Sequence, residues 1–202
     1  MTTPEDREIV LDARAMRGIA HPLRVRLLAE LRMHGPSTAT RLGQRLGQSS
    51  GATSYHLRQL AAYGFVEEVP RDGGRERWWR AIHRSTRVRI AELDPETAEL
   101  TGGWLRHVVE FNAEQALRAV DEFPALPAQW RGATAFMDTV LRLEPAEAER
   151  LKGEVMALLN SYRQNRPEAI ADAPAGAAPV MAVFQLFRRA DADPDDALDG
   201  QS

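Results

Sequence analysis

Small polar residues and one arginine share one side of the helix that we predict over residues 50–62. These outward positions are Ser50, Gly51, Ser54, Tyr55 and Arg58. Their hydroxyl and guanidinium groups can donate hydrogen bonds to phosphate oxygens and to base edges, and the small residues allow a close approach to a groove. This side of the helix is therefore a candidate surface for contacting duplex DNA.

A second group of arginines follows in a segment with the composition of a β-hairpin. Two β-prone runs, residues 65–69 and 75–82, flank the turn-rich sequence Pro-Arg-Asp-Gly-Gly. Arg71 and Arg75 lie at the expected tip of this hairpin, and Arg77 lies just beyond it. We predict that these three side chains contact the minor groove or the phosphate backbone.

The helices that would position these groups are predicted from apolar repeats and capping residues. Leu23, Leu27 and Leu31 recur every four residues, which is typical of one buried helix face. A tight turn at residues 47–49 separates two short helices, the second capped by Ser50, and such a pair is a helix-turn-helix. The predicted helices span residues 5–18, 22–34, 38–46 and 50–63.

The charge of the chain is divided unequally between its two halves. Residues 1–90 contain 16 Arg and 9 Asp or Glu, a net charge of +7, and the rest of the chain contains 10 Arg or Lys and 20 Asp or Glu, a net charge of −10. A basic front half indicates a polyanionic partner. The excess of Arg over Lys suits phosphate and guanine recognition, and genomic base composition explains it equally well.

The composition also excludes several classes of function. The chain has no cysteine, so disulfides, thiolate metal sites and cysteine nucleophiles are excluded. No apolar run approaches the ~20 residues of a membrane span, and the polar N-terminus does not resemble a secretory signal, so we expect a cytoplasmic protein. Because no phosphate-binding loop or hydrolase motif is present, we predict neither an enzyme nor a cofactor.

Several motifs resemble those of the ArsR-type winged helix-turn-helix regulators. They are Ala-His-Pro-Leu-Arg-Val-Arg-Leu-Leu at 20–28, Ser-Gly-Ala-Thr-Ser-Tyr-His-Leu-Arg-Gln-Leu at 50–60, and Gly-Phe-Val at 64–66. Within that family, residues 74–80 resemble a branch that lacks metal-binding cysteines. The resemblance covers residues ~15–83. It implies a homodimer that binds a palindromic operator, usually as a repressor, with the helix at 50–62 in the major groove.

One arrangement of acidic residues and a histidine is a candidate metal site. Asp94, Glu96, His107 and Glu110 have a spacing similar to that of the zinc site of some ArsR-type metal sensors. Glu96, however, stands where a histidine is expected, and zinc prefers histidine and cysteine ligands. A solvated acidic helix face explains the same residues, so we predict no metal.

The back half is predicted to alternate between helices and strands. Its longest helix has apolar residues on two sides, which makes it the main candidate for dimerisation. The predicted elements are a helix over 94–123, a linker over 124–131, a strand over 136–143, a helix over 145–162, a strand over 180–187 and a disordered acidic tail over 191–202.

Together these patterns predict an α+β fold that is mainly α. Residues 1–90 are expected to form a winged helix-turn-helix DNA-binding domain, and residues 91–202 a region for dimerisation and for reading an effector that the sequence does not identify. The expected partners are a double-stranded DNA operator and a second copy of the chain. Two alternatives stay open: a winged helix that binds protein without DNA, and a repressor gated by a metal or small ligand.

Overall fold

The computed structural model of the chain describes residues 9–70, 76–83, 85–88, 93–162 and 172–189. By its internal contacts the chain divides into two units, Met1–Ala133 and Thr134–Ser202. The first unit extends past residue 90 because the long helix after the hairpin packs against the helices before it. The functional division that the sequence predicts at residue 90 stays a prediction.

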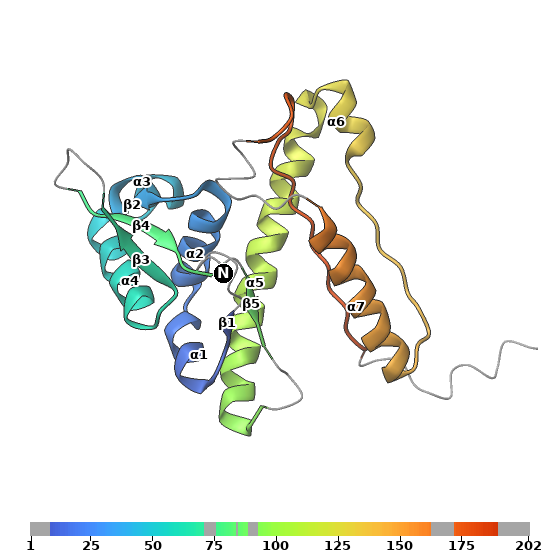
Figure 1. Ribbon diagram of the computed structural model, residues 1–202, viewed down its shortest axis with the longest axis horizontal. Helices are drawn as coiled ribbons and strands as arrows, with labels where there is room; N and C mark the ends of the chain where they lie inside the picture. Colours follow the sequence, from blue (N-terminus) through green and yellow to red (C-terminus); the bar gives the residue numbers. More distant parts are fainter. Residues whose placement is uncertain (1–8, 71–75, 84, 89–92, 163–171, 190–202) are drawn as a thin grey trace, which may run out of the picture. The chain divides into compact units, whose positions relative to one another are not determined.

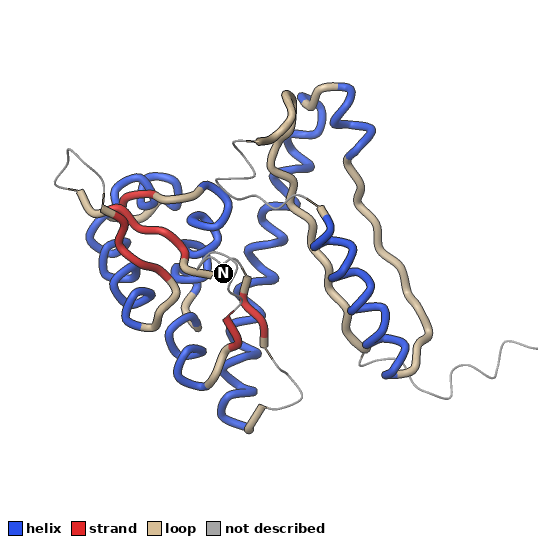
Figure 2. Tube along the Cα trace, viewed as in Figure 1, coloured by secondary structure: helices blue, strands red, loops and turns tan. Residues whose placement is uncertain are grey.

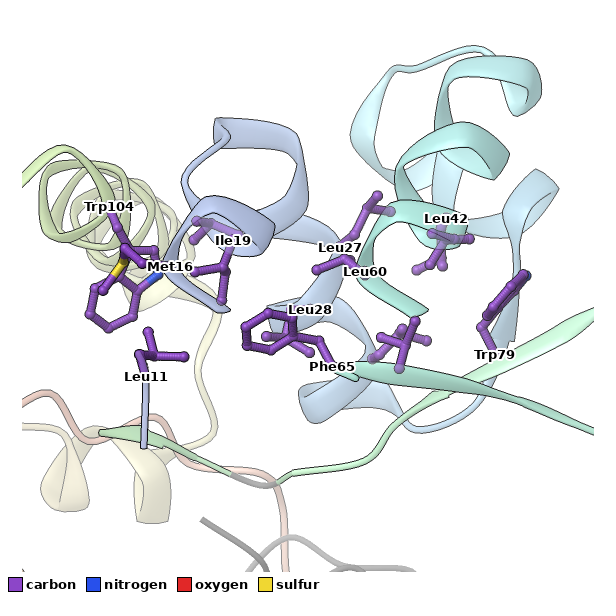
Figure 3. Packing of buried hydrophobic residues seen from close by; sticks show 14 residues of the cluster. Leu11, Met16, Ile19, Leu27, Leu28, Leu42, Leu60, Phe65, Trp79 and Trp104 are labelled. Atoms are coloured by element: carbon purple, nitrogen blue, oxygen red, sulfur yellow. The ribbon is translucent and has the colours of Figure 1, made fainter. Parts of the chain in front are cut away.

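The first unit begins with four helices and a small sheet (Figure 1). The helices are α1 (Ala13–Ile19), α2 (Pro22–His34), α3 (Ala39–Leu46) and α4 (Ser50–Ala62). Their apolar sides meet in one core (Figure 3), in which Leu27, Leu42, Leu57, Leu60 and Phe65 have no exposed surface. The predicted helices over 22–34, 38–46 and 50–63 are confirmed to within a residue.

The hairpin of the first unit belongs to a three-stranded antiparallel sheet. Its strands are β2 (Ser37–Thr38), β3 (Val66–Val69) and β4 (Trp78–Ala81), in the order β2-β4-β3. Val66 pairs with Ala81 and Val69 with Trp78, so the connection between β3 and β4 spans residues 70–77. Helices followed by this sheet make a winged helix, and the predicted α+β, mainly α fold class is confirmed.

The predicted first helix begins too early. Ile9–Val10 form β1, which pairs in parallel with β5 (Thr86–Arg87), and α1 begins only at Ala13. Asp12 is the N-cap of α1, and its Oδ1 accepts a hydrogen bond of 2.7 Å from the backbone N–H of Ala15. The acidic residues before position 9 that indicated an earlier start lie outside the described residues.

A helix of 28 residues, α5 (Pro95–Glu122), completes the first unit's core. It packs against α1 and α2, with Trp104 and Phe111 each 7% exposed. The short helices η3 (Phe123–Ala125) and α6 (Ala128–Ala133) follow, so the prediction of a linker over 124–131 was wrong. These turns bury no side chain, which is why no apolar repeat indicated them.

The described residues of the second unit include the predicted helix, α7 (Pro145–Ser161). Glu144 and Glu147 form a capping box at its start, and Pro145 occupies the first helical position. The two predicted strands are wrong, because residues 136–143 and 180–187 are extended but lie in no sheet (Figure 2). An alternating pattern gives a strand only where a partner strand is present to pair with it. The tail predicted over 191–202 lies outside the described residues.

A glycine in α1 allows the first helix to lie close to the end of α4. A Cβ atom built on Gly18 would lie 2.6 Å from Cβ and 2.8 Å from Cδ1 of Tyr63. We expect Gly18→Ala to destabilise the protein by about 1–3 kcal/mol, because the overpacking outweighs the gain in helix propensity. Chemical denaturation monitored by circular dichroism measures this change in the free energy of unfolding.

Gly102 in the middle of α5 is the matched control for this substitution. A Cβ atom on Gly102 would meet nothing within 4 Å, so Gly102→Ala should stabilise the protein by roughly 0.5–1 kcal/mol. Equal effects of the two alanines on unfolding would contradict the close packing of α1 on Tyr63.

Candidate nucleic-acid interface

The turn between α3 and α4 fixes how the two helices meet. Gly47 ends α3 in the left-handed conformation with φ of 64° and ψ of 34°. The backbone N–H of Gln48 donates to the carbonyl of Gly43 at 2.8 Å, and a Cβ on Gly43 would lie 2.7 Å from the Gln48 carbonyl oxygen. The turn therefore requires a glycine at both positions.

The helix after this turn begins with a serine cap, one residue earlier than predicted. The N-cap of α4 is Ser49 rather than Ser50, and its Oγ accepts a hydrogen bond of 3.2 Å from the backbone N–H of Ala52. Ser50 is thus released from capping and lies exposed in the first turn. Ser50, already one of the five candidates on α4, therefore has its hydroxyl available to a partner.

The inner side of α4 is fully buried. Thr53, Leu57 and Leu60 have no exposed surface, and the Thr53 hydroxyl donates to the Ser49 carbonyl at 2.9 Å. At the end of the helix Gly64 adopts a φ of 77°, and the N–H of Phe65 donates to the Leu60 carbonyl at 2.9 Å. This Schellman motif leads the chain directly into β3.

The outer side of α4 brings the five helical candidates together. Ser50, Gly51, Tyr55 and Arg58 are exposed, Tyr55 by 54%, and Ser54 is half-buried. Nη2 of Arg58 donates to Oγ of Ser54 at 2.9 Å, so the guanidinium is held along the helix surface. The geometry leaves this group free to turn toward a phosphate or a guanine by breaking one exposed hydrogen bond.

The hairpin contributes fewer described groups than the sequence predicts. Arg77 is exposed, and its Nη1 lies 3.6 Å from Oε2 of Glu68 on β3. Arg71 and Arg75 lie outside the described residues, so their contribution stays a prediction. On the neighbouring pair of β-residues, Nε of Arg80 donates to Oε1 of Glu67 at 2.7 Å.

An arginine on α3 is a candidate that the sequence patterns did not indicate. Arg41 is exposed, and its guanidinium carbon lies 4.9 Å from the centre of the Trp78 ring. Beside it, the Thr40 hydroxyl donates to Oε1 of Glu76 at 3.0 Å. A cation held on an aromatic face is already partly ordered, which suits it to a phosphate. Only its exposed position beside the apolar stripe of α3 could have indicated it.

His56 is half-buried and packs against the start of α2. Its ring centre lies 4.3 Å from that of His21, and its Nδ1 is buried without a hydrogen-bond partner among the described residues. Burial lowers the pKa of His56, and the nearby Arg24 lowers it further. His21 is the N-cap of α2, and its Nδ1 accepts from the N–H of Leu23 at 3.1 Å. His56 therefore helps to join α4 to the start of α2.

The four metal candidates do not form one cluster. Asp94 caps α5, where hydrogen bonds from the backbone and hydroxyl of Thr97 lower the pKa of Asp94. Glu96 pairs with Arg17 on α1. Farther along α5, Nδ1 of His107 lies 3.3 Å from Oε2 of Glu110. Over the part of the chain that the structure describes, no three residues of ligand type gather around one point.

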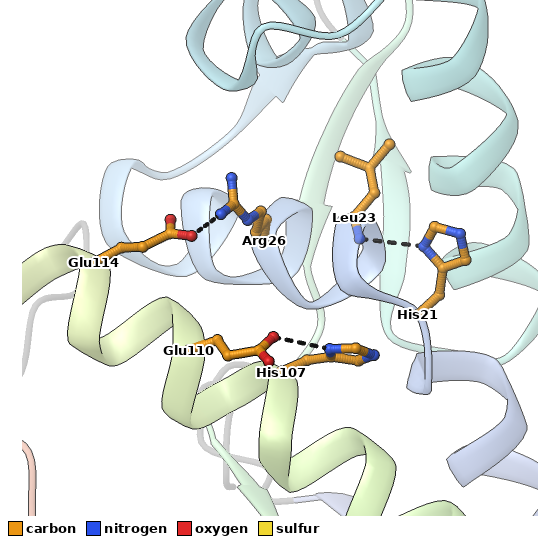
Figure 4. A network of polar contacts seen from close by, with 6 residues as sticks. All are labelled: His21, Leu23, Arg26, His107, Glu110 and Glu114. Carbon is orange, nitrogen blue, oxygen red and sulfur yellow. Dashed lines mark hydrogen bonds and ion pairs between the residues drawn. The ribbon is translucent and has the colours of Figure 1, made fainter.

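A cavity of about 410 Å³ lies in the first unit beside the start of α2. Its wall includes His21 and His56 as well as charged groups from α2 and α5. Figure 4 shows that these charged groups face one another in pairs, His107 with Glu110 and Arg26 with Glu114. The polar groups of the cavity wall are thus engaged with one another across α2 and α5.

Comparison with known proteins identifies a helix-turn-helix domain in the first unit. Residues 19–69 match the family model described as a helix-turn-helix domain. No curated protein matches the chain. Within the described residues, no helix has the length and apolar character needed to cross a membrane.

Three solved structures are similar to parts of the chain. The winged helix-turn-helix DNA-binding domain of Mb0332 from Mycobacterium bovis, a possible ArsR-family regulator, is 21% identical over 52% of this chain and 80% of its own, with a TM-score of 0.32. A possible transcriptional regulator for arsenical resistance is 25% identical over 55% and 97%, with a TM-score of 0.30. RV1404 from Mycobacterium tuberculosis is 18% identical over 73% and 82%, with a TM-score of 0.30.

TM-scores of this size do not establish a common overall fold. The identification of a winged helix-turn-helix depends instead on the family match and on three features of the structure. These are the geometry of the turn, the buried inner side of α4 and the antiparallel hairpin. Residues 19–69 match the helix-turn-helix family model, and with its hairpin this part of the chain is a winged helix-turn-helix, as the sequence resemblance to ArsR-type regulators predicts.

Proposed function

We propose that the protein is a dimeric transcription regulator that binds a specific double-stranded DNA operator and acts as a repressor. The observation that carries this proposal is the outer side of α4, where exposed small polar residues and Arg58 lie on a helix whose inner side is locked in the core. A helix held in this way can enter a major groove as a rigid body. The net charge of +7 over residues 1–90 favours the approach to DNA.

Each part of the winged helix has a distinct task in this proposal. Residues of α4 read base edges, Arg41 on α3 contacts a backbone phosphate, and the hairpin arginines reach the minor groove or the backbone beside it. Two copies of α4 in a dimer would enter successive major grooves about 34 Å apart. A palindromic operator follows from the twofold symmetry of such a dimer.

The long helix α5 supplies the proposed dimer contact. One side of it packs against the core, and its other side exposes an apolar stripe. The exposed members of this stripe are Leu105, Val109, Leu117 and Val120, with exposed fractions of 36%, 48%, 65% and 51%. Covering the second apolar side with a partner stabilises such a helix. The α5 of a second copy exposes the same stripe, so the two helices can cover each other.

Arg58→Ala tests the reading role of α4. We expect affinity for an operator selected from a random DNA pool to fall by ~1–3 kcal/mol, since a bidentate contact to guanine is lost. A binding titration at fixed salt measures the change. Arg14→Ala removes the same charge from the exposed surface of α1 and should leave affinity almost unchanged. If the two variants bind equally well, α4 does not read the operator.

The hairpin tip is tested by the double variant Arg71→Ala with Arg75→Ala. Loss of two phosphate contacts should weaken specific and nonspecific binding alike and reduce the slope of log affinity against log salt by about 2. The matched control, Arg142→Ala with Arg150→Ala, removes two charges from the second unit. An unchanged slope would remove the hairpin from the DNA, and the absence of any salt-sensitive retention on DNA-cellulose by the unaltered protein would favour a protein-binding winged helix instead.

Val109→Asp tests the α5 contact. A carboxylate in the middle of the stripe would be desolvated in the dimer, so we expect dissociation to monomers at micromolar concentration and at least a tenfold loss of operator affinity. Light scattering coupled to size exclusion measures the mass. Arg118→Gln makes the same change in net charge on α5 away from the stripe and should leave the mass unaltered. A dimer that survives Val109→Asp would argue against this interface.

A further inference from the structure

The second unit has no interior of its own. None of its described residues is buried, and the least exposed side chains of α7 are only half-buried. The half-buried apolar residues of α7, at positions 148, 151, 155, 156 and 159, form one stripe along the helix. A single helix with a half-covered stripe does not bury enough apolar surface to fold alone.

The two extended segments of this unit carry the largest share of its exposed apolar surface. Eleven large apolar side chains project from residues 136–143 and 180–187 with exposed fractions from 38% to 89%. They are Phe136, Met137, Val140, Leu141, Leu143, Val180, Met181, Val183, Phe184, Leu186 and Phe187. At on the order of 100 Å² each, the six side chains in residues 180–187 present roughly 600 Å² of apolar surface. A specific interface buries about 800 Å² per partner, and the backbone of a paired strand supplies the difference.

The backbone of these segments is also without partners. Among the described residues, 135–143 and 178–188 form no hydrogen bond between backbone groups. An extended, apolar segment with a free row of N–H and C=O groups is a template for pairing with another strand. Pairing with another strand would therefore bury apolar side chains of these segments and form hydrogen bonds with their backbone groups.

The apolar pattern differs between the two segments and ranks them. In residues 180–187 both faces are apolar, with Phe184 and Leu186 on one and Val183 and Phe187 on the other, as in a central strand. In residues 136–143 one face includes Asp138 and Arg142, as in a strand at an edge. Residues 180–187 are therefore better suited than residues 136–143 to a position inside a sheet, with a strand along each edge.

We propose that residues 180–187 pair antiparallel with the same residues of a second copy of this chain. A twofold axis that passes between two copies of a strand, level with their midpoints, pairs the strand antiparallel with its own copy, so one association satisfies both chains. A two-stranded pair is marginal by itself and is stabilised by packing against a helix, and each copy of the chain brings one helix, α7, to the pair. The inference rests on the proposed function in that the α5 contact holds two copies together and raises their effective concentration.

A cysteine scan tests this pairing directly, since the chain contains no cysteine. Each position from 180 to 187 is replaced singly by cysteine in the full-length protein, which is then exposed to a mild oxidant without DNA. Directly opposed residues of an antiparallel pair have Cα atoms about 4.5–5.5 Å apart, within the 4.4–6.8 Å that a disulfide spans. We expect one or two adjacent positions to form covalent dimers rapidly and the positions at the ends of the segment to form few.

Glu154→Cys is the matched control, because Glu154 is exposed on α7 in the same unit. Its crosslinking sets the rate of random collision. Crosslinking no faster than this control at every position from 180 to 187 overturns the proposal, and it points to a different protein as the partner. Uniform crosslinking along the whole segment also overturns it, since a paired strand has one register.

A second measurement separates this pairing from the α5 contact. The double variant Val183→Asp with Phe184→Asp should increase amide hydrogen exchange over residues 180–187 and weaken the association of two chains into a dimer. The contacts between the winged helix and DNA should persist. If both exchange and dimer mass are unchanged, the strand pairing is wrong and the proposed function stands. If instead the crosslinks form but no DNA is bound by the unaltered protein, the strand pairing stands and the proposed function is wrong.

Discussion

The direction in which α4 faces is set by the complete burial of one of its sides. Thr53, Leu57 and Leu60 are removed from water against α2, α3 and the first residues of β3. Burying each leucine is worth about 1.5–3 kcal/mol, so any rotation of α4 about its axis carries a large cost. On the other side, the guanidinium of Arg58 is hydrogen-bonded within the same helix, to Ser54. The core therefore sets the direction in which the exposed polar groups of α4 face.

Much of the winged helix could be predicted from the sequence because its signals are local. The four-residue repeat of leucines in α2 and the glycines around the α3–α4 turn each specify structure within a few residues of themselves. The same applies to the five candidates on α4, whose common side follows from helical spacing alone. The cap was misplaced by one residue because Ser49 and Ser50 are equally good caps in sequence.

What the sequence did not reveal depends on partners that are distant along the chain. The start of α1 is delayed because residues 9–10 pair with 86–87, and no local pattern reports such a pairing. The cation of Arg41 over Trp78 joins two elements separated by most of the winged helix. The alternation over 136–143 and 180–187 was real, yet within one chain it lacks the complementary strands that would turn it into a sheet.

The glycines at the two ends of α4 bear on how the proposed DNA preference of this protein could change over evolutionary time. Gly47 before the helix and Gly64 after it both have positive φ, and each is fixed by backbone hydrogen bonds to the neighbouring turn. Inserting or deleting one residue between them would rotate later side chains by about 100° and break one of these turns. Substitution of the outward side chains could therefore change the DNA sequence that α4 is proposed to recognise. A change in the number of residues in the helix would instead disrupt the fold.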